Sequence, residues 1–180
     1  MALLRTFGIS LGLALLVLAP ARAQVAASEY EVKAAFLYNF TKFVEWPESA
    51  FRDEIDPFWI CVVGDDPFGK SLRAVVEGQE VEGRQIKLRP MNDLQDPTGC
   101  HLLFLGRTER QRTADVLAAA REGNVLTVGE AEGFLEQGGV IQFTLDNGKV
   151  RFDINPGAAE RVGLKISSKL LRLATLRGGR

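Results

Sequence analysis

The chain has 180 residues, of which 46% are hydrophobic and 25% charged, and its formal net charge is −1. This composition is that of a globular protein and excludes a disordered chain, a collagen-like fibre and a membrane protein with many spans. The balanced charge gives no overall attraction to nucleic acid, and the length fits one domain.

Residues 1–23 have the layout of a secretory signal peptide. Arg5 comes before an apolar run from Phe7 to Ala19, and the small-residue triplet Ala21–Ala23 ends the segment. A membrane-spanning helix needs about 20 apolar residues, so a retained anchor is the second interpretation. We expect cleavage after the triplet and export of one domain, residues 24–180, to the periplasm.

The first element predicted in the exported part is an amphipathic helix over residues 29–46. Ser28 and Glu31 match a capping box that would start the helix, and Pro47 stops the pattern. Apolar residues recur at helical spacing at Val32, Ala35, Phe36, Phe40, Phe43 and Val44, and the opposite face is expected to carry Lys33, Asn39, Lys42 and Glu45. Trp46 either joins the core or lies on a contact surface.

A β-α-β pattern follows. Residues 58–63 form an apolar run typical of a strand buried on both faces, and a turn at 64–67 leads to a helix at 69–77. Further strands are predicted at 85–89, 102–105 and 125–128, with a helix at 109–121. This alternation favours a single α/β domain with a mixed, mainly parallel sheet flanked by helices.

The C-terminal part is predicted to be a β-hairpin and a terminal helix. Asn147-Gly148 separates apolar segments at 140–145 and 149–154, and Asn-Gly is the strongest short signal for a hairpin. Helical spacing from 158 to 176 predicts the terminal helix, bent near Gly163. Its basic residues Lys165, Lys169, Arg172 and Arg177 form either a solvated face or a surface that attracts an acidic partner or anionic lipid.

Two cysteines lie on apolar, strand-like runs. In an oxidising compartment, a bridge between Cys61 and Cys100 would close a loop of about 40 residues and stabilise the fold by about 4 kcal/mol. Two buried free thiols are the alternative. The cysteines and the lone His101 do not have zinc-ligand spacing, so we expect no metal or cofactor and interpret His101 as a packed strand residue.

The remaining polar residues favour binding over catalysis. With one histidine beside a cysteine, a Ser-His or Cys-His relay is not expected. Adjacent aspartates on the turn at 64–67 point apart, and Asp before Pro is typical of a turn. That turn nevertheless lies where α/β proteins bind ligands. With further residues chosen by accessibility, the candidate partner or ligand contacts are Trp46, Asp65, Asp66, Phe68, Arg151 and Asn155.

Two motifs lie near the ends of the exported chain: the first helix from Tyr30 to Pro47, and Phe152–Asn155 followed by Gly163–Ala174. Together they resemble the YfiR family of periplasmic proteins. The resemblance covers essentially the whole exported chain. It implies a small α/β domain with a regulatory role and no catalysis, and a disulfide between Cys61 and Cys100. Some relatives have a second cysteine pair that this sequence lacks, so redox control through that pair does not apply.

The family resemblance also implies a class of partner. The founding member restrains an inner-membrane diguanylate cyclase by binding its periplasmic portion, and an outer-membrane lipoprotein can sequester it. We therefore expect a partner in the periplasmic domain of a diguanylate cyclase or a sensor kinase, and a sequestering lipoprotein fits the same role. A periplasmic small-molecule carrier or sensor with a cleft at the strand ends is the alternative. Neither function involves nucleic acid, and a homodimer is compatible with both.

Overall fold

The computed structural model describes residues 21–91, 97–107 and 110–178, so most of the predicted signal peptide lies outside the described residues. The elements are α1 Ala21–Phe43, β1 Val44–Glu45, η1 Glu48–Ala50, β2 Phe58–Val63, α2 Lys70–Val76, β3 Glu80–Val81, β4 Arg84–Met91, β5 Leu102–Leu105, α3 Arg110–Ala120, β6 Leu126–Gly129, β7 Ile141–Asp146, β8 Lys149–Ile154, α4 Pro156–Arg161, β9 Lys165–Ile166, α5 Ser168–Leu171 and β10 Thr175–Leu176.

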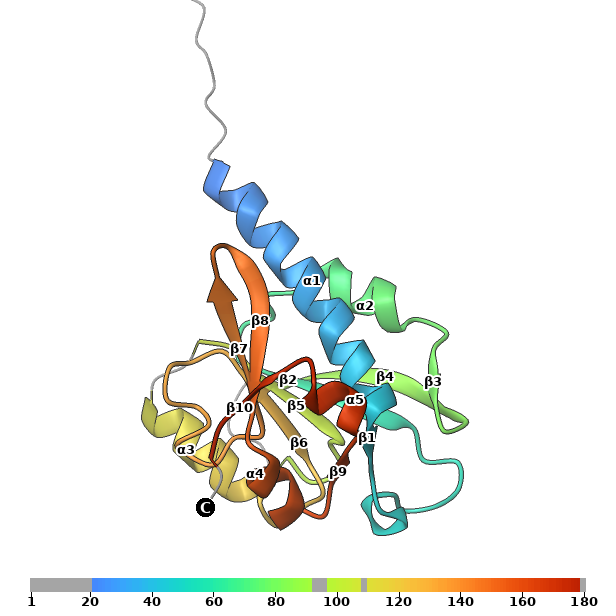
Figure 1. Ribbon diagram of the computed structural model, residues 1–180. Coiled ribbons are helices and arrows are strands. Elements are labelled where there is room, and N and C mark those ends of the chain that lie inside the picture. Colours follow the sequence, from blue (N-terminus) through green and yellow to red (C-terminus); the bar gives the residue numbers. More distant parts are fainter. Residues whose placement is uncertain (1–20, 92–96, 108–109, 179–180) are drawn as a thin grey trace, which may run out of the picture.

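A mixed, mainly parallel sheet forms the centre of the domain (Figure 1). In the described residues its order is β10-β8-β7-β6-β5-β2-β4-β3, and a separate antiparallel pair joins β1 to β9. Strands β4, β2, β5, β6 and β7 are parallel neighbours, whereas β7–β8 and β3–β4 are antiparallel. The predicted single α/β domain is therefore confirmed.

Alternating residues of the central strands bury two hydrophobic clusters. On β2, Ile60 and Val62 face the cluster under α1 and α2, and Cys61 and Val63 face the cluster under α3. Helices therefore cover both faces of the sheet, as the apolar run in β2 requires.

A disulfide links the two cysteines across neighbouring parallel strands. Cys61 lies within β2, and Cys100 comes just before β5, with a Cα–Cα distance of 5.9 Å. The pairing of Ile60 with Leu102 brings the two cysteines close together. Of the two alternatives in the sequence, the disulfide is the one that the structure contains.

The predicted bounds of the first helix are wrong at both ends. The helix α1 already begins at Ala21 and continues through Ser28, so the capping-box residues lie inside it. Ala-rich sequence upstream of Ser28 has high helix propensity and carries the helix toward the N-terminus. At the other end, Val44 pairs with Ile166 of β9, because the chain turns into a short strand before Pro47.

The hairpin prediction is confirmed, but the long terminal helix is wrong. Asn147 and Gly148 both have positive φ, 50° and 75°, as a type I′ turn requires. The segment 158–176 instead contains α4, β9, α5 and β10. Gly163 at φ 74° ends the first short helix, and pairing with β1 and β8 then draws the chain into strands. The basic residues of the segment therefore share no single helix face.

Candidate functional site

The carboxyl ends of three parallel strands surround a pocket of about 440 Å³. Gly64 and Asp65 follow β2, Arg107 lies just beyond β5, and Glu130 directly follows β6. Tyr30 of α1 completes the wall. Parallel strands bring their loops together at this edge, which is where open α/β sheets bind ligands. Asp65 thus lies at the ligand-binding edge of the sheet, where the sequence predicts the turn at 64–67.

The rest of that turn has a structural role. Asp66 Oδ1 accepts a hydrogen bond from the backbone N–H of Phe68 at 2.8 Å, which fits the turn interpretation. Phe68 is only 3% exposed, and its ring packs edge-on against Tyr30 and Phe104 at 5.5 and 4.7 Å between centroids. The expectation that Phe68 is accessible is therefore wrong, because the turn directs its ring into the core under α1.

A buried ionic cluster lies beside this pocket. The Lys33 ammonium is ion-paired with Glu29 one turn earlier and with Glu130 Oε2 at 2.5 Å. Tyr30 donates its hydroxyl hydrogen to Glu130 Oε1 at 2.8 Å. Burial of the phenol, together with this hydrogen bond to Glu130, raises the pKa of Tyr30 well above its usual value. The cluster ties the first helix to the end of a central strand.

The prediction that Lys33 lies on the polar face of the helix is wrong. Its side chain is 2% exposed and lies on the same stripe as Leu37 and Phe40, which are fully buried. The signal was present in the sequence, since positions 33, 37, 40 and 44 share one helix face. A lysine within an apolar stripe predicts a buried partner carboxylate, but the position of Glu130 follows only from the sheet.

The contacts within this ionic cluster fix the position of the first helix. Both oxygens of Glu130 are occupied, one by Lys33 and one by Tyr30, and the second carboxylate, Glu29, also contacts the ammonium. Buried ion pairs that satisfy one another fix orientation at little net gain in stability. We interpret Lys33 as the anchor that sets the position of α1 over the sheet.

Trp46 lies in the core, 8% exposed, so its assignment to a contact surface by accessibility is wrong. Its ring packs edge-on against Phe58 at 4.8 Å, and its Nε1 donates to the carbonyl oxygen of His101 at 3.1 Å. The residue directly follows β1, which pairs with β9 outside the central sheet.

His101 holds a loop against the sheet. Its Nδ1 accepts from the backbone N–H of Trp59 at 2.9 Å, so Nε2 carries the proton and donates to the Ala50 carbonyl oxygen at 3.1 Å. The ring stacks between Phe51 and Phe58, and burial lowers the pKa of the imidazole. The interpretation of His101 as a packed residue is confirmed, although it lies just before β5 and not within the strand.

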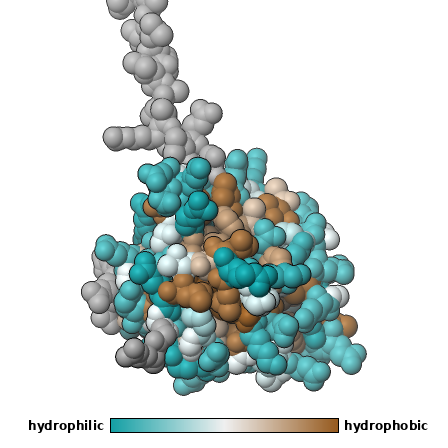
Figure 2. Space-filling model, viewed as in Figure 1, coloured by the Kyte–Doolittle hydropathy of each residue, from teal (hydrophilic) through white to brown (hydrophobic). Residues whose placement is uncertain are grey.

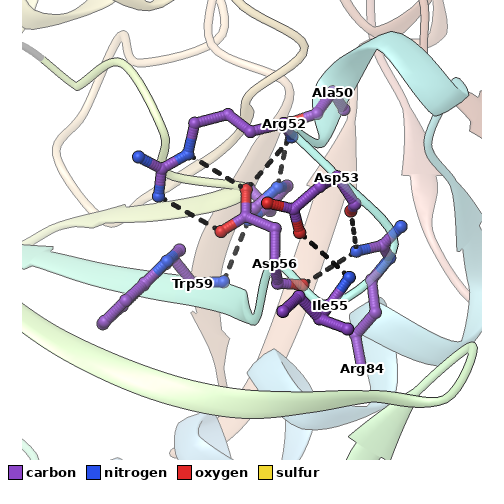
Figure 3. Close-up of polar contacts among 8 residues, drawn as sticks. Ala50, Arg52, Asp53, Ile55, Asp56, Trp59 and Arg84 are labelled. Atoms are coloured by element: carbon purple, nitrogen blue, oxygen red, sulfur yellow. Dashed lines mark hydrogen bonds and ion pairs between the residues drawn. The ribbon is translucent and has the colours of Figure 1, made fainter.

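The same loop is stabilised by two arginines (Figure 3). Arg52 contacts the Asp56 carboxylate through its guanidinium at 3.2 Å and lowers the pKa of that carboxyl. Arg84 of β4 donates to the backbone carbonyl oxygens of Asp53 and Asp56 at 2.7 and 2.9 Å. Figure 3 shows Arg52 turned toward Asp56, and Arg84 turned toward the backbone of Asp53 and Asp56. The loop is therefore bound to β4 through Arg84 and to His101 through the carbonyl oxygen of Ala50.

The last two candidate residues lie apart from the pocket at the carboxyl ends. Arg151 is exposed on β8, and Asn155 at the end of β8 is 8% exposed and caps α4 by accepting from Ala158 N–H at 3.0 Å. The pairing of Ile154 with Ile141 places this strand end beside the beginning of β7. The six candidate residues therefore do not form one site.

An apolar surface occurs where α1, β8 and the C-terminal segment meet. Figure 2 shows hydrophobic side chains gathered in the middle of one face, framed by polar residues. The elements at this place carry Val32 at 42% and Leu173 at 72% exposure, together with the half-buried Phe36 and Val150. These four residues are called the α1–β8 face below. Apolar groups with a polar rim are typical of a protein interface.

Together these features define a class of protein. It is a small α/β domain with a disulfide between adjacent parallel strands, a first helix anchored by a buried lysine and a partly apolar face. Within the described ranges, no group of three or more His, Cys, Asp or Glu side chains is placed to hold a metal ion.

The chain belongs to the YfiR/HmsC-like family, whose sequence profile it matches over residues 30–175. This family comprises periplasmic regulators of signalling proteins rather than enzymes. Among the helices that the structure describes, none combines the length and apolar character needed to cross a bilayer.

Two solved structures are similar to this chain at low sequence identity, and the first of them shares its fold. A conserved domain protein from Vibrio cholerae O1 biovar El Tor has a TM-score of 0.53 and 13% identity over 82% of this chain. The ABC domain from Streptococcus pneumoniae in complex with L-Trp has a TM-score of 0.49 and 12% identity over 84% of the chain. This chain spans 59% of the length of each. Comparison with curated proteins gave no match.

Proposed function

We propose that this protein represses an inner-membrane signalling protein by binding its periplasmic domain, and that the partner is a diguanylate cyclase or a sensor kinase. The observation that carries the proposal is membership of the YfiR/HmsC-like family over residues 30–175. An outer-membrane lipoprotein that sequesters the regulator fits the same scheme. A mature protein of residues 24–180, freed by signal-peptide cleavage, would meet both partners in the periplasm.

The α1–β8 face is the surface proposed for this contact. Val32 and Leu173 are large apolar side chains that remain exposed outside the buried core. Burying them against a partner would contribute through the hydrophobic effect, and polar neighbours would supply the rim. Exposed Asp65, Asp66 and Arg151 remain proposed peripheral contacts, whereas the buried Trp46 and Phe68 do not.

Repression would follow from differential affinity. A regulator that binds the inactive conformation of a receptor domain more tightly than the active one shifts the population toward the inactive form. A tenfold preference corresponds to about 1.4 kcal/mol. Release by a competing lipoprotein would then restore activity without any chemical step.

The first experiment measures cellular cyclic-di-GMP in a deletion strain, with and without the exported protein restored. A rise on deletion that complementation reverses supports repression of a cyclase. An unchanged level removes the cyclase, and phosphorylation of candidate sensor kinases in the same strains then tests the second partner class. If neither output changes, the proposed repression is wrong.

Surface variants separate binding from folding. Replacing Val32 and Leu173 by Glu should abolish complementation and crosslinking to the partner while the Tm stays close to that of the wild type. Ile55→Glu is the matched control, since Ile55 is 89% exposed on the loop between η1 and β2. Full complementation by the double variant would exclude the α1–β8 face as the contact surface.

A further inference from the structure

A second and larger pocket, of about 710 Å³, lies at the opposite edge of the sheet. Its walls come from the end of α3, the loop before β7, α4 and the segment after β10. Because α3 leads into the beginning of β6, this is the edge where the parallel strands begin. Figure 1 shows α3 and α4 close together there. This pocket is therefore separate from the pocket at the carboxyl ends.

Three arginines from separate segments line the larger pocket. They are Arg121 after α3, Arg161 at the end of α4 and Arg177 after β10, while Glu136 is the acidic residue of the lining. The lining is thus positively charged, although the chain as a whole has a formal net charge of −1. Three guanidinium groups around one cavity concentrate positive potential and favour an anion.

The arginines keep donors available. Arg121 uses Nη2 to donate to the Gln137 carbonyl oxygen at 3.1 Å, and Arg177 uses Nε to contact Asp153 at 3.0 Å. Arg161 forms no hydrogen bond or ion pair with the residues described by the structure. Each guanidinium has five N–H donors, so these bonds orient two of the groups and leave most donors unused.

The side-chain amide of Asn155 on the pocket wall also keeps a donor available. Asn155 is 8% exposed, and its Oδ1 is occupied by the N–H of Ala158. Its Nδ2 donates to no atom of the described residues. This N–H group is therefore free to donate to a ligand that occupies the pocket. Gly178 packs closely against this amide, since a Cβ there would lie 2.8 Å from Nδ2.

From this geometry we infer that the pocket binds a small organic anion through a carboxylate or phosphate group. Arginine forks match both groups with paired hydrogen bonds, and the Asn155 amide can donate a further bond to the same anion. Leu135, Ala158 and Val162 line the cavity as well and would contact an apolar part of the ligand. The volume lies within the range of small-molecule sites. This inference does not rest on the proposed function.

The test is an NMR titration of the exported protein with two matched probes, benzoate and phenyl phosphate. Methyl benzoate serves as the neutral control. We expect saturable shifts of the amides of Gly138, Asn155 and Gly178 with at least one anion and none with the ester. Response to benzoate alone assigns a carboxylate ligand, and response to phenyl phosphate alone assigns a phosphate ligand.

Two variants test the residues. Asn155→Asp keeps an oxygen to cap α4 but replaces the donor by a negative charge, and Arg161→Gln removes a guanidinium that has no partner among the described residues. Each should raise the dissociation constant at least tenfold. Arg73→Gln on exposed α2 makes the same charge change as Arg161→Gln away from the pocket and should leave binding unchanged. Absence of saturable shifts with both anions, or equal weakening by Arg73→Gln, overturns the inference.

Discussion

Replacing Lys33 by Met tests whether the buried ionic cluster holds α1 on the sheet. The change removes the ammonium but keeps an unbranched side chain of similar length in a site that is 2% exposed. It leaves Glu130, whose side chain is 4% exposed, and Glu29, at 16%, without their cation. Removing one partner of a buried pair costs about 3–5 kcal/mol.

The expected loss is large for a domain of this size. A change of 3–5 kcal/mol corresponds to a fall in Tm of roughly 6–20 °C. Urea unfolding at pH 7, followed by far-UV circular dichroism with the disulfide intact, measures the difference. Lys70→Met is the matched control, because Lys70 is exposed at the start of α2 and should change the free energy of unfolding by at most about 0.5 kcal/mol.

A second substitution tests the cause. Glu130→Gln in the Lys33→Met background removes the uncompensated charge, and the glutamine carbonyl can still accept from Tyr30. The double variant should therefore be more stable than Lys33→Met alone by at least 1 kcal/mol, an interaction typical of coupled buried residues. A loss below about 1 kcal/mol for Lys33→Met, or a double variant weaker than the single, would refute the anchoring role.

Three further predictions concern stability. Cys61→Ser or Cys100→Ser should lower the free energy of unfolding by about 4 kcal/mol, because the bridge closes a loop with a sequence separation of 39. Thiol titration of the oxidised wild type should find no free thiol. Because burial lowers the pKa of His101 below 6.5, the unfolded chain binds the proton more readily, so urea midpoints should fall as the pH drops from 7 toward 5, more steeply than in His101→Asn. Equal slopes would contradict this linkage. Trp46→Ala should cost about 3–5 kcal/mol, and a wild-type Tm in that variant would show that Trp46 is not a core residue.

The local elements of this fold could be predicted because each depends on nearby residues. The apolar run at 58–63, the Asn147-Gly148 turn and the helix spacing at 109–121 each produced the expected element. Such signals arise from backbone preferences and from side chains that must be buried within one element. The parallel order of the strands also followed from the alternation of helices and strands.

The prediction of a terminal helix is wrong because this segment depends on distant residues. Residues 158–176 have helical spacing, yet β9 pairs with β1 and β10 pairs with β8, partners more than 20 residues away in each case. Those pairings supply backbone hydrogen bonds that a local pattern cannot anticipate, and Gly163 at positive φ makes the break possible.

The sequence by itself determined the α/β class, the family and the secondary structure of the central strands. Tertiary structure decided which side chains are accessible: it buried Lys33, Trp46 and Phe68, and it placed Asn155 beside three arginines from distant segments. Burial and pocket lining depend on which elements pack together, and long-range packing sums contributions from residues far apart in the chain. Lys33 and Glu130 are separated by 97 positions in the sequence. Their ion pair can be identified only from the tertiary structure, in which the sheet brings Glu130 beside the first helix.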